Sequence, residues 1–593
     1  MPQFQLRPEW GQRNPVSRKF SYFAGEGTIV SGSDPITEGI AAPRGPGWRN
    51  RLALIATAVL VPVLLLGIVE AGLRVFGVGN PANVTRPCTD HGHPAFCDNQ
   101  FFTAAYFPPG MLRTPRPYAI PATKEPGTYR IFVLGESAAW GDPDPTYAFS
   151  RYLEVMLRQR FPSMKFEVIN ASITAVNSHV LLPVARELAQ HQPDPFIVYA
   201  GNNEVVGPYG PGTVLTPAAL SLPGIRARIF VNSTRLGQLV AKLSSAGRQR
   251  PQEWHGMEMF LERQVRANSP QMKPVYENFA ANLRDIVAAA RRSGAQVLVS
   301  TVAMNLKDCA PFASMHREGL KEEELRSWHS SVQQGEAAEN AGSYSDALKQ
   351  YLAAAEIDAQ YAELQFRIAR CLSALGDFAA AKERFVRSRD LDTLRFRADS
   401  GLNEAIRSVS AGAGQGVELV DTEAIFAQES PHGIPGSELF YEHVHMNPAG
   451  NYLIARGLFS RIANLLPSGL PHSSSDAVPT EQECDRLLAL TPYDRSRVAG
   501  LVLRKLEHPP FMNQLNHSGQ VAKMKQAAET SSEYADTVAA YGWAIAQNPQ
   551  DRLLHLNYGF FLHRYAPAAS AQELRMALPY DNAPVLCNWR KFD

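Results

Sequence analysis

Short apolar runs alternate with helix-like segments from about residue 128 onward, and this alternation restricts the possible folds more than any other feature. The runs Ile131–Leu134 and Pro195–Ala200 stop abruptly at turn residues, which is typical of buried parallel strands. Strands that alternate with amphipathic helices predict a parallel sheet with helices on both faces. The predicted strands are residues 130–134, 165–170, 195–200, 296–302 and 417–420, and the predicted helices are 149–160, 178–190, 276–293 and 452–465.

A second feature is the run Leu52–Val69, which contains 18 consecutive residues without a charge. With the following apolar residues it is long enough to cross a bilayer, so we predict a transmembrane signal anchor over residues 52–76. Arg44, Arg49 and Arg51 precede the run, and the positive-inside rule then places the N-terminus in the cytoplasm and the rest outside, in the periplasm if the source is bacterial. A cleaved signal peptide and a buried core helix are the alternatives.

Composition limits the partners of the chain. It has 593 residues, a net charge of +1 and an ordinary apolar content, which describes a globular protein of several domains and gives no reason to expect a nucleic-acid partner. Residues 1–50 are polar and predict a disordered cytoplasmic tail. Residues 80–127 are rich in turn-forming residues and predict an irregular connector. Within it, Cys88 and Cys97 either form a local disulfide or remain free thiols.

A repeat interrupts the alternation between residues 307 and 412. Gly342-Ser-Tyr and Gly376-Asp-Phe lie 34 residues apart, and the same offset relates Ala347 to Ala381 and Tyr351 to Phe385. Small and aromatic residues at this period predict helix-turn-helix units of the tetratricopeptide type, which commonly bind proteins or peptides. After a Ser-rich linker at residues 471–475, residues 480–593 predict a second helical, tetratricopeptide-like region.

Four polar segments follow successive strands: Gly135-Glu-Ser137, Asn170-Ala-Ser172, Gly201-Asn-Asn-Glu204 and Glu442-His-Val-His445. In this order the segments resemble the SGNH (GDSL-type) hydrolase family, named for Ser, Gly, Asn and His in four blocks. The resemblance covers residues 128–306 and 413–466. It implies a three-layer α/β/α, flavodoxin-like fold with the helical repeat inserted before the last strand.

The resemblance also implies a role for each matched residue. Ser137 would be the nucleophile, activated by His445 as general base, with Glu442 orienting the imidazole. His443 is the rival base, but its spacing from the acid does not match the family pattern. The oxyanion hole would comprise the Ser137 N–H, the Ser172 N–H and the Asn203 amide, supported by Gly135 and Gly201.

Two matched positions depart from the family pattern. The family usually has Asp where this chain has Glu442, and Gly where it has Ser172. The favoured function is a membrane-anchored, extracytoplasmic esterase that uses neither metal nor cofactor and cleaves an acyl or acetyl ester on a glycan or lipid-like molecule. The alternatives are transfer of the acyl group to a glycan, and a tetratricopeptide scaffold with a weakly active or inactive hydrolase domain.

Overall fold

A computed structural model describes residues 48–216, 221–245, 253–467, 477–531, 533–578 and 580. The chain divides into two compact units, one ending at Leu66 and the other beginning at Gly67. Residues 1–47 of the predicted tail lie outside the described residues, and so does the predicted linker at residues 471–475. Helix α1 (Trp48–Val75) begins within the last three residues of the predicted tail.

The larger unit is built around a five-stranded parallel sheet in the order β5-β4-β6-β7-β8. Each strand lies within about two residues of its predicted position, and the predicted parallel sheet is confirmed. In chain order the strands run 2-1-3-4-5, which is the flavodoxin-like arrangement. The strands are β4 (Thr128–Gly135), β5 (Lys165–Asn170), β6 (Pro195–Tyr199), β7 (Gln296–Ser300) and β8 (Val417–Val420).

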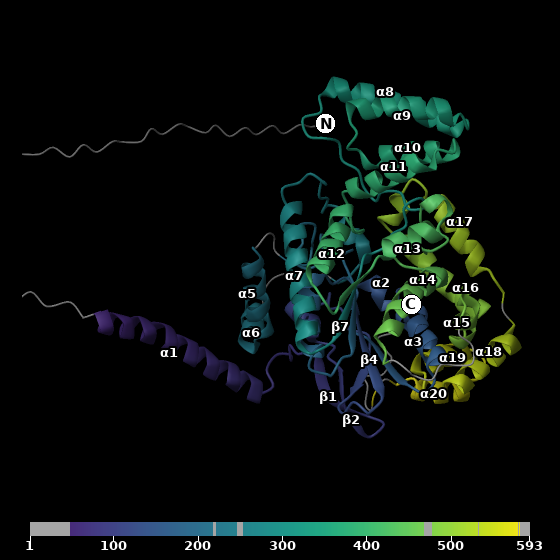
Figure 1. Ribbon diagram of the computed structural model, residues 1–593. Coiled ribbons are helices and arrows are strands. Elements are labelled where there is room, and N and C mark those ends of the chain that lie inside the picture. Colours follow the sequence, from purple (N-terminus) through teal and green to yellow (C-terminus); the bar gives the residue numbers. More distant parts are fainter. Residues whose placement is uncertain are drawn as a thin grey trace, which may run out of the picture. The chain divides into compact units, whose positions relative to one another are not determined.

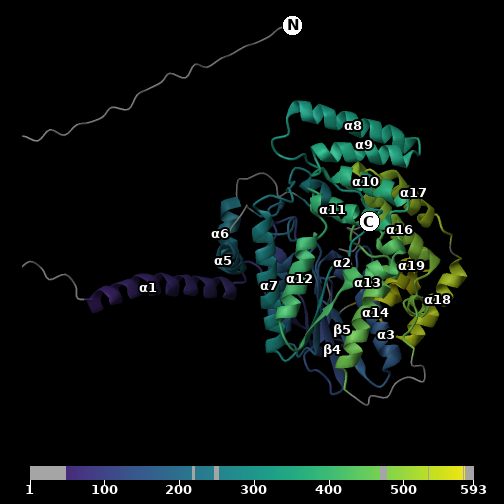
Figure 2. The same ribbon diagram turned by 45° about the horizontal axis from the view of Figure 1, so that its top comes forward.

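Helices cover both faces of this sheet, as Figures 1 and 2 show from two directions. One face carries α4 (Ser178–Leu188), α7 (Met272–Arg292) and α12 (Ser400–Gly412), and the other carries α3 (Phe149–Arg160) and α14 (Pro448–Leu465). Every residue of β4 is buried, because helices pack on both sides of it. The apolar runs therefore form strands since only the middle layer removes all of their side chains from water.

Helix α1 contains the predicted anchor. Its segment Ala56–Val75 has 20 residues with a mean hydropathy of 2.2, and none of it is buried. The segment is thus long and apolar enough to cross a membrane. The direction of crossing remains a prediction.

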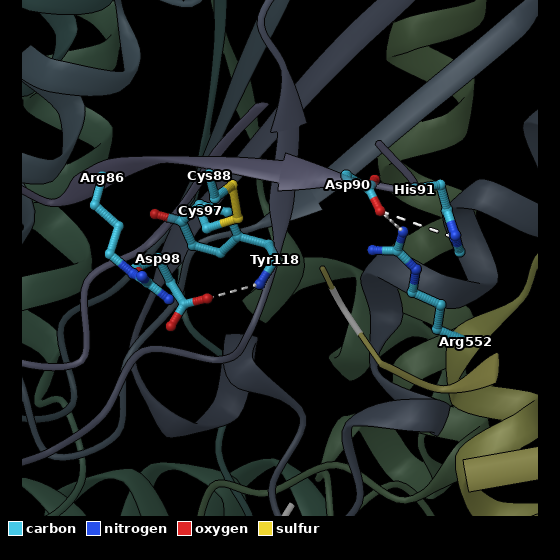
Figure 3. The surroundings of a disulfide bond; sticks show 8 residues. All are labelled: Arg86, Cys88, Asp90, His91, Cys97, Asp98, Tyr118 and Arg552. Carbon is cyan, nitrogen blue, oxygen red and sulfur yellow. Dashed lines mark hydrogen bonds and ion pairs between the residues drawn. A yellow bond between two sulfur atoms is a disulfide. The ribbon is translucent and has the colours of Figure 1, made fainter. Parts of the chain in front are cut away.

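Part of the predicted irregular connector, residues 80–127, forms a small antiparallel sheet of β1 (Thr85–Asp90), β2 (His93–Asp98) and β3 (Ala119–Pro121), whereas residues 106–118 contain neither helix nor strand. Prolines and charged residues in β1 and β2 hide the alternation that marks a strand. Cys88 and Cys97 form a disulfide that joins β1 to β2, with 5.9 Å between their Cα atoms (Figure 3). The cross-link closes a hairpin that the sequence signal alone leaves unrecognised.

The predicted insertion, residues 307–412, contains four helices before α12, which packs on the sheet instead: α8 (Glu322–Asn340), α9 (Tyr344–Ile357), α10 (Ala362–Ala374) and α11 (Phe378–Leu391). The 34-residue offset relates α9 to α11 from end to end, and the repeated pairs Ala347/Tyr351 and Ala381/Phe385 are buried. Phe385 belongs to the same buried apolar cluster as Leu306 from the loop after β7, so the insertion is packed on the parent domain. The assignment to the tetratricopeptide type remains a prediction.

The described part of the C-terminal region, residues 480–578, is mainly helical and is attached to the sheet domain beside α3. The Tyr152 hydroxyl on α3 donates to Asp485 at 2.6 Å, and the Asn557 amide donates to Asp144 at 3.2 Å. Arg497 also pairs with Asp144. The helices of the C-terminal region are α15 (Glu481–Leu487), α16 (Pro492–Leu506), α17 (His517–Ala528), α18 (Tyr534–Gln547), α19 (Arg552–Leu562) and α20 (Pro567–Met576). These buried polar contacts make the region a part of the same structural unit.

Candidate active site

Ser137 lies immediately beyond the carboxyl end of β4, at the first position of the short helix α2 (Ser137–Trp140). The turn depends on Gly135, because a Cβ there would meet the Tyr199 carbonyl oxygen at 2.3 Å and Ala139 Cβ at 2.4 Å. At the first position of a helix the Ser137 N–H has no acceptor within that helix. From β4 the chain first adds β5 on one side and then β6 on the other, so the strand order reverses between β4 and β6. Ligands bind at such a reversal in open parallel sheets.

His445 is carried by a tight loop between α13 (Thr422–Glu429) and α14. Phe440 and Met446 form an isolated antiparallel bridge, and the Tyr441 N–H donates to the His445 carbonyl at 2.9 Å. The loop is also held from outside, since the Asn305 side-chain amide donates to the Glu442 carbonyl at 2.9 Å. The imidazole is therefore presented by a fixed backbone.

The structure brings Ser137, near the start of the sheet domain in sequence, together with Glu442 and His445, which share a loop near its end. His445 Nε2 lies 2.8 Å from Ser137 Oγ, and His445 Nδ1 contacts Glu442 Oε1. A carboxylate at Nδ1 favours the tautomer with hydrogen on Nδ1, which leaves Nε2 free to accept the serine proton. In this arrangement Glu442 reaches the imidazole despite its extra methylene.

Glu442 serves a second imidazole as well. His443 Nδ1 contacts Oε2, and the His443 backbone N–H donates to the same oxygen at 2.5 Å. Burial by itself would raise the pKa of Glu442, but the two imidazoles hold that pKa well below its usual range. Burial also lowers the pKa of His443, against the opposing effect of Glu442. Both shifts favour an ionised Glu442 carboxylate and a neutral His443 imidazole.

Glu442, His443 and His445 each offer one atom of the kind that binds a metal, all within 4.8 Å of one another. These atoms are already engaged, because both Nδ1 atoms face oxygens of the Glu442 carboxylate. A metal ion at this point would have to break the contacts that orient the two imidazoles.

Sequence reasoning missed one residue of the site, Glu136. Its buried carboxylate accepts the backbone N–H groups of Gly201 at 3.1 Å, Asn202 at 2.9 Å and Asn203 at 3.4 Å. Because Glu136 directly precedes Ser137, these hydrogen bonds hold the segment that carries Asn203 beside the candidate nucleophile. Burial, reinforced by the nearby Glu204, raises the pKa of Glu136 well above its usual value. A charged residue directly before the candidate nucleophile was the available signal.

Gly201, predicted as a supporting residue, has φ +146°, a conformation that favours glycine. A side chain would meet nothing closer than 3.7 Å there, so backbone conformation rather than space accounts for the glycine. Its N–H is one of the three that Glu136 accepts. Gly201 therefore bends the chain so that the N–H groups at the end of β6 converge on one carboxylate.

The Ser172 N–H, predicted as an oxyanion donor, has an acceptor within its own loop. This N–H donates to Asn170 Oδ1 at 3.1 Å, and the residue is fully buried. Asn170 itself is fixed by donating to the Ala139 carbonyl at 2.7 Å. The Ser172 N–H is thus engaged in shaping the loop after β5, because Asn170 folds back on its own backbone.

Asp142 is a further charged neighbour of the imidazole. Its Oδ2 lies 3.7 Å from His445 Nε2, and its carboxylate pairs with Lys505 of α16. Burial would raise the pKa of Asp142, but Lys505 and His445 lower it. A helix from the C-terminal region therefore contributes to the electrostatics beside His445.

Two cavities of about 690 and 270 Å³ lie away from these residues. The larger cavity is lined by the inserted helix α11 and by residues 266–268. The smaller cavity is lined by residues of the loop after β7, of α11 and of α13. Neither is lined by Ser137, His445 or Asn203. The chemistry of the side chains, rather than cavity size, identifies the candidate site.

Glu136→Gln is expected to lower kcat for a small ester by about 100-fold, the order of effect of losing one oxyanion donor. Whichever way the amide is oriented, its NH2 group faces at least one backbone N–H of residues 201–203, so the segment carrying Asn203 must shift. Steady-state kinetics together with a thermal melt would measure the effect.

Glu204→Gln is the matched control, because Glu204 is also buried but accepts the N–H and the hydroxyl of Ser178. The Ser178 hydroxyl can donate or accept, so it can pair with the amide NH2 group of a Gln. It should keep kcat within about threefold. An unchanged kcat in Glu136→Gln, or equal losses in both variants, would contradict the assigned role of Glu136.

No family model matches this chain, and no curated protein is similar to it in sequence. Among solved structures, the acetyl xylan esterase AlAXEase aligns at 11% identity over 56% of this chain and 99% of its own, with a TM-score of 0.27. TesA aligns at 13% identity over 57% of this chain and 99% of its own, with a TM-score of 0.24. At these TM-scores neither likeness decides the fold or the activity, and the function must be argued from the site.

Proposed function

We propose that this protein is a membrane-anchored serine esterase of the SGNH type, which hydrolyses an acyl or acetyl ester through an acyl-Ser137 intermediate. The proposal is carried by one observation: His445 Nε2 lies 2.8 Å from Ser137 Oγ while its Nδ1 is held by Glu442. A serine hydroxyl becomes an effective nucleophile only when such a base takes its proton.

In the first half-reaction, Ser137 Oγ attacks the ester carbonyl carbon as its proton passes to His445 Nε2. The imidazolium that forms is stabilised by the Glu442 carboxylate. Negative charge develops on the carbonyl oxygen, and we assign its stabilisation to the Ser137 N–H and the Asn203 side-chain amide. The bond to the leaving alcohol then breaks, His445 returns the proton to that oxygen, and the acyl group remains on Ser137.

In the second half-reaction, His445 removes a proton from water, which attacks the acyl carbon. Collapse of this intermediate releases the carboxylic acid and restores the Ser137 hydroxyl. A sugar hydroxyl in place of water would give acyl transfer with the same residues, so the two reactions differ only in the acceptor.

The location of the enzyme is argued from α1 and from the hairpin that follows it. The segment Ala56–Val75 can span a bilayer, and the disulfide between Cys88 and Cys97 comes soon after it. Disulfides form and persist outside the reducing cytoplasm. This supports an extracytoplasmic catalytic domain with a cytoplasmic N-terminus.

The full-length protein in detergent should be labelled at Ser137 by a fluorophosphonate and should hydrolyse p-nitrophenyl acetate. Peptide mapping identifies the labelled residue, and product analysis with a glycan acceptor separates hydrolysis from acyl transfer. Absence of both labelling and turnover would overturn the proposal and would favour a binding role for the inserted helices.

A further inference from the structure

The helices α5 (Leu222–Ser233) and α6 (Arg235–Ser245) carry large apolar side chains that the described part of the chain does not cover. Four of them form what we call the α5–α6 apolar face: Phe230, 72% exposed, Val231, 52%, Val240, 56%, and Leu243, 64%. Exposed apolar groups that gather on adjacent helices usually mark a surface with a partner.

Spacing places these side chains on one side of each helix. Phe230 and Val231 lie three and four residues after the exposed Ala227, and Leu243 lies three residues after Val240. Residues at these intervals are neighbours on a helix surface. The exposed apolar side chains therefore line one side of each helix rather than being scattered around it.

The opposite side of α5 is fixed to the protein. Ile225 is buried, the Asn232 amide donates to the Ala105 carbonyl at 3.1 Å, and Arg226 pairs with Asp285 at 2.7 Å. Figures 1 and 2 show both helices on the outer side of α7. The apolar face thus points away from the protein while its helix pair is held in place.

The helix pair is also tied to the end of the candidate membrane span. The Glu70 carboxylate accepts the N–H groups of Arg235 at 3.0 Å and Leu236 at 2.9 Å. Gln238 accepts the Asn80 N–H at 2.7 Å and donates to the Asn80 carbonyl at 3.1 Å. Glu70 lies five residues before Val75, about 8 Å from the end of the span at 1.5 Å per residue. The start of α6 therefore lies beside the last turns of the candidate span, within about 8 Å of its end.

The charge of this segment matches an anionic surface. Residues 222–245 contain four basic residues and no acidic one, namely Arg226, Arg228, Arg235 and Lys242. Arg228 and Lys242 are exposed, one on each helix. Helices with a basic polar side and an apolar side of Phe, Leu and Val lie in the interface of phospholipid bilayers.

We propose that the α5–α6 apolar face inserts into the lipid–water interface beside the end of α1, with the exposed Arg228 and Lys242 at the phosphates of anionic phospholipids. This inference rests on the anchoring part of the proposed function and not on the esterase reaction. Insertion would give the domain a second attachment to the bilayer and so fix its orientation relative to the membrane.

The test uses the full chain in nanodiscs of phosphatidylcholine and phosphatidylglycerol, with a fluorophore on Leu243→Cys. Cys309, Cys371 and Cys484 are buried, and Cys587 is first replaced by Ser. Lipids brominated on their acyl chains should quench the probe by about twofold, because interfacial helices lie roughly 5–10 Å into the headgroup and acyl boundary. A probe on Ser330→Cys, exposed on α8, should not be quenched.

A third probe on Leu64→Cys separates the possible outcomes. Quenching at positions 64 and 243 is the expected result. Quenching at 64 alone would overturn the inference while leaving the anchor in place, and no quenching at either position would overturn both. A signal at 243 that depends on protein concentration but not on bromination would overturn the inference in favour of a second copy of the chain. None of these readouts uses ester hydrolysis, so failure of the esterase proposal remains distinguishable.

Discussion

Ser137→Ala is expected to lower the rate of p-nitrophenyl acetate hydrolysis by about 10⁴- to 10⁶-fold and to abolish fluorophosphonate labelling. The hydroxyl is the atom that forms the covalent bond, and His445 Nε2, at 2.8 Å, would be left with no proton to accept. Binding and the oxyanion donors remain, so a small residual rate above that in water is expected. The measurement is the steady-state rate of the full-length protein in detergent.

The control for this change is Ser330→Ala, which removes an exposed hydroxyl from α8 far along the chain from the site. It should leave the hydrolysis rate within about twofold, as is usual for surface substitutions. Because Ser137 is partly exposed and begins a short helix, its replacement by Ala should change the melting temperature little. Equal hydrolysis by the Ser137→Ala variant and the parent protein would refute the acyl-enzyme mechanism.

The residues that sequence reasoning located are those whose signal is local. The apolar runs that become β4 and β6 identify themselves, because buried parallel strands have no polar face. Ser137 and His445 follow from motifs at the ends of such elements, although 307 residues separate them in the chain. The distance between their side chains could be learned only from the fold.

What sequence reasoning missed depends on contacts between distant segments. Glu136 was passed over because its partners are backbone N–H groups of residues 201–203, which leave no trace in the sequence. Ser172 was assigned as a donor because it stands where the family has a glycine whose backbone N–H is a donor, and the sequence does not show that Asn170 accepts this N–H. The hairpin of β1 and β2 was missed because its prolines and charges obscure the strand pattern.

The insertion and the C-terminal region both contribute aromatic side chains that contact His443 in the candidate site. The His443 ring packs against Phe312 at 5.3 Å, Phe511 at 5.5 Å and Phe396 at 6.5 Å between ring centroids. These three rings come from the loop after β7, the C-terminal region and the end of the insertion. The second imidazole on Glu442 is therefore fixed by aromatic side chains from three parts of the chain.

The two imidazoles on one carboxylate can be told apart by substitution. His443→Phe should keep the aromatic packing and the backbone N–H to Glu442, and we expect it to lower kcat by about 10- to 100-fold at most, the effect of losing one charge-assisted hydrogen bond. His445→Phe should lower kcat by about 10⁴-fold or more, because it removes the base. The reverse ranking would identify His443 as the base.

Glu442→Gln is expected to lower kcat by about 10⁴-fold with little change in KM, the effect seen when the acid of a serine triad is replaced by its amide. The His443 backbone N–H donates to Oε2 and cannot reverse its polarity, so the amide oxygen of Gln must occupy that position. The amide NH2 then faces His445 Nδ1, which favours the tautomer with hydrogen on Nε2. In that tautomer Nε2 cannot accept the Ser137 proton.

Glu442→Asp keeps the charge and both acceptor oxygens, so it should retain far more activity than Glu442→Gln. Stopped-flow measurement of the acylation burst would locate the loss in the first half-reaction, and a Gln variant as active as the Asp variant would show that Glu442 does not set the tautomer.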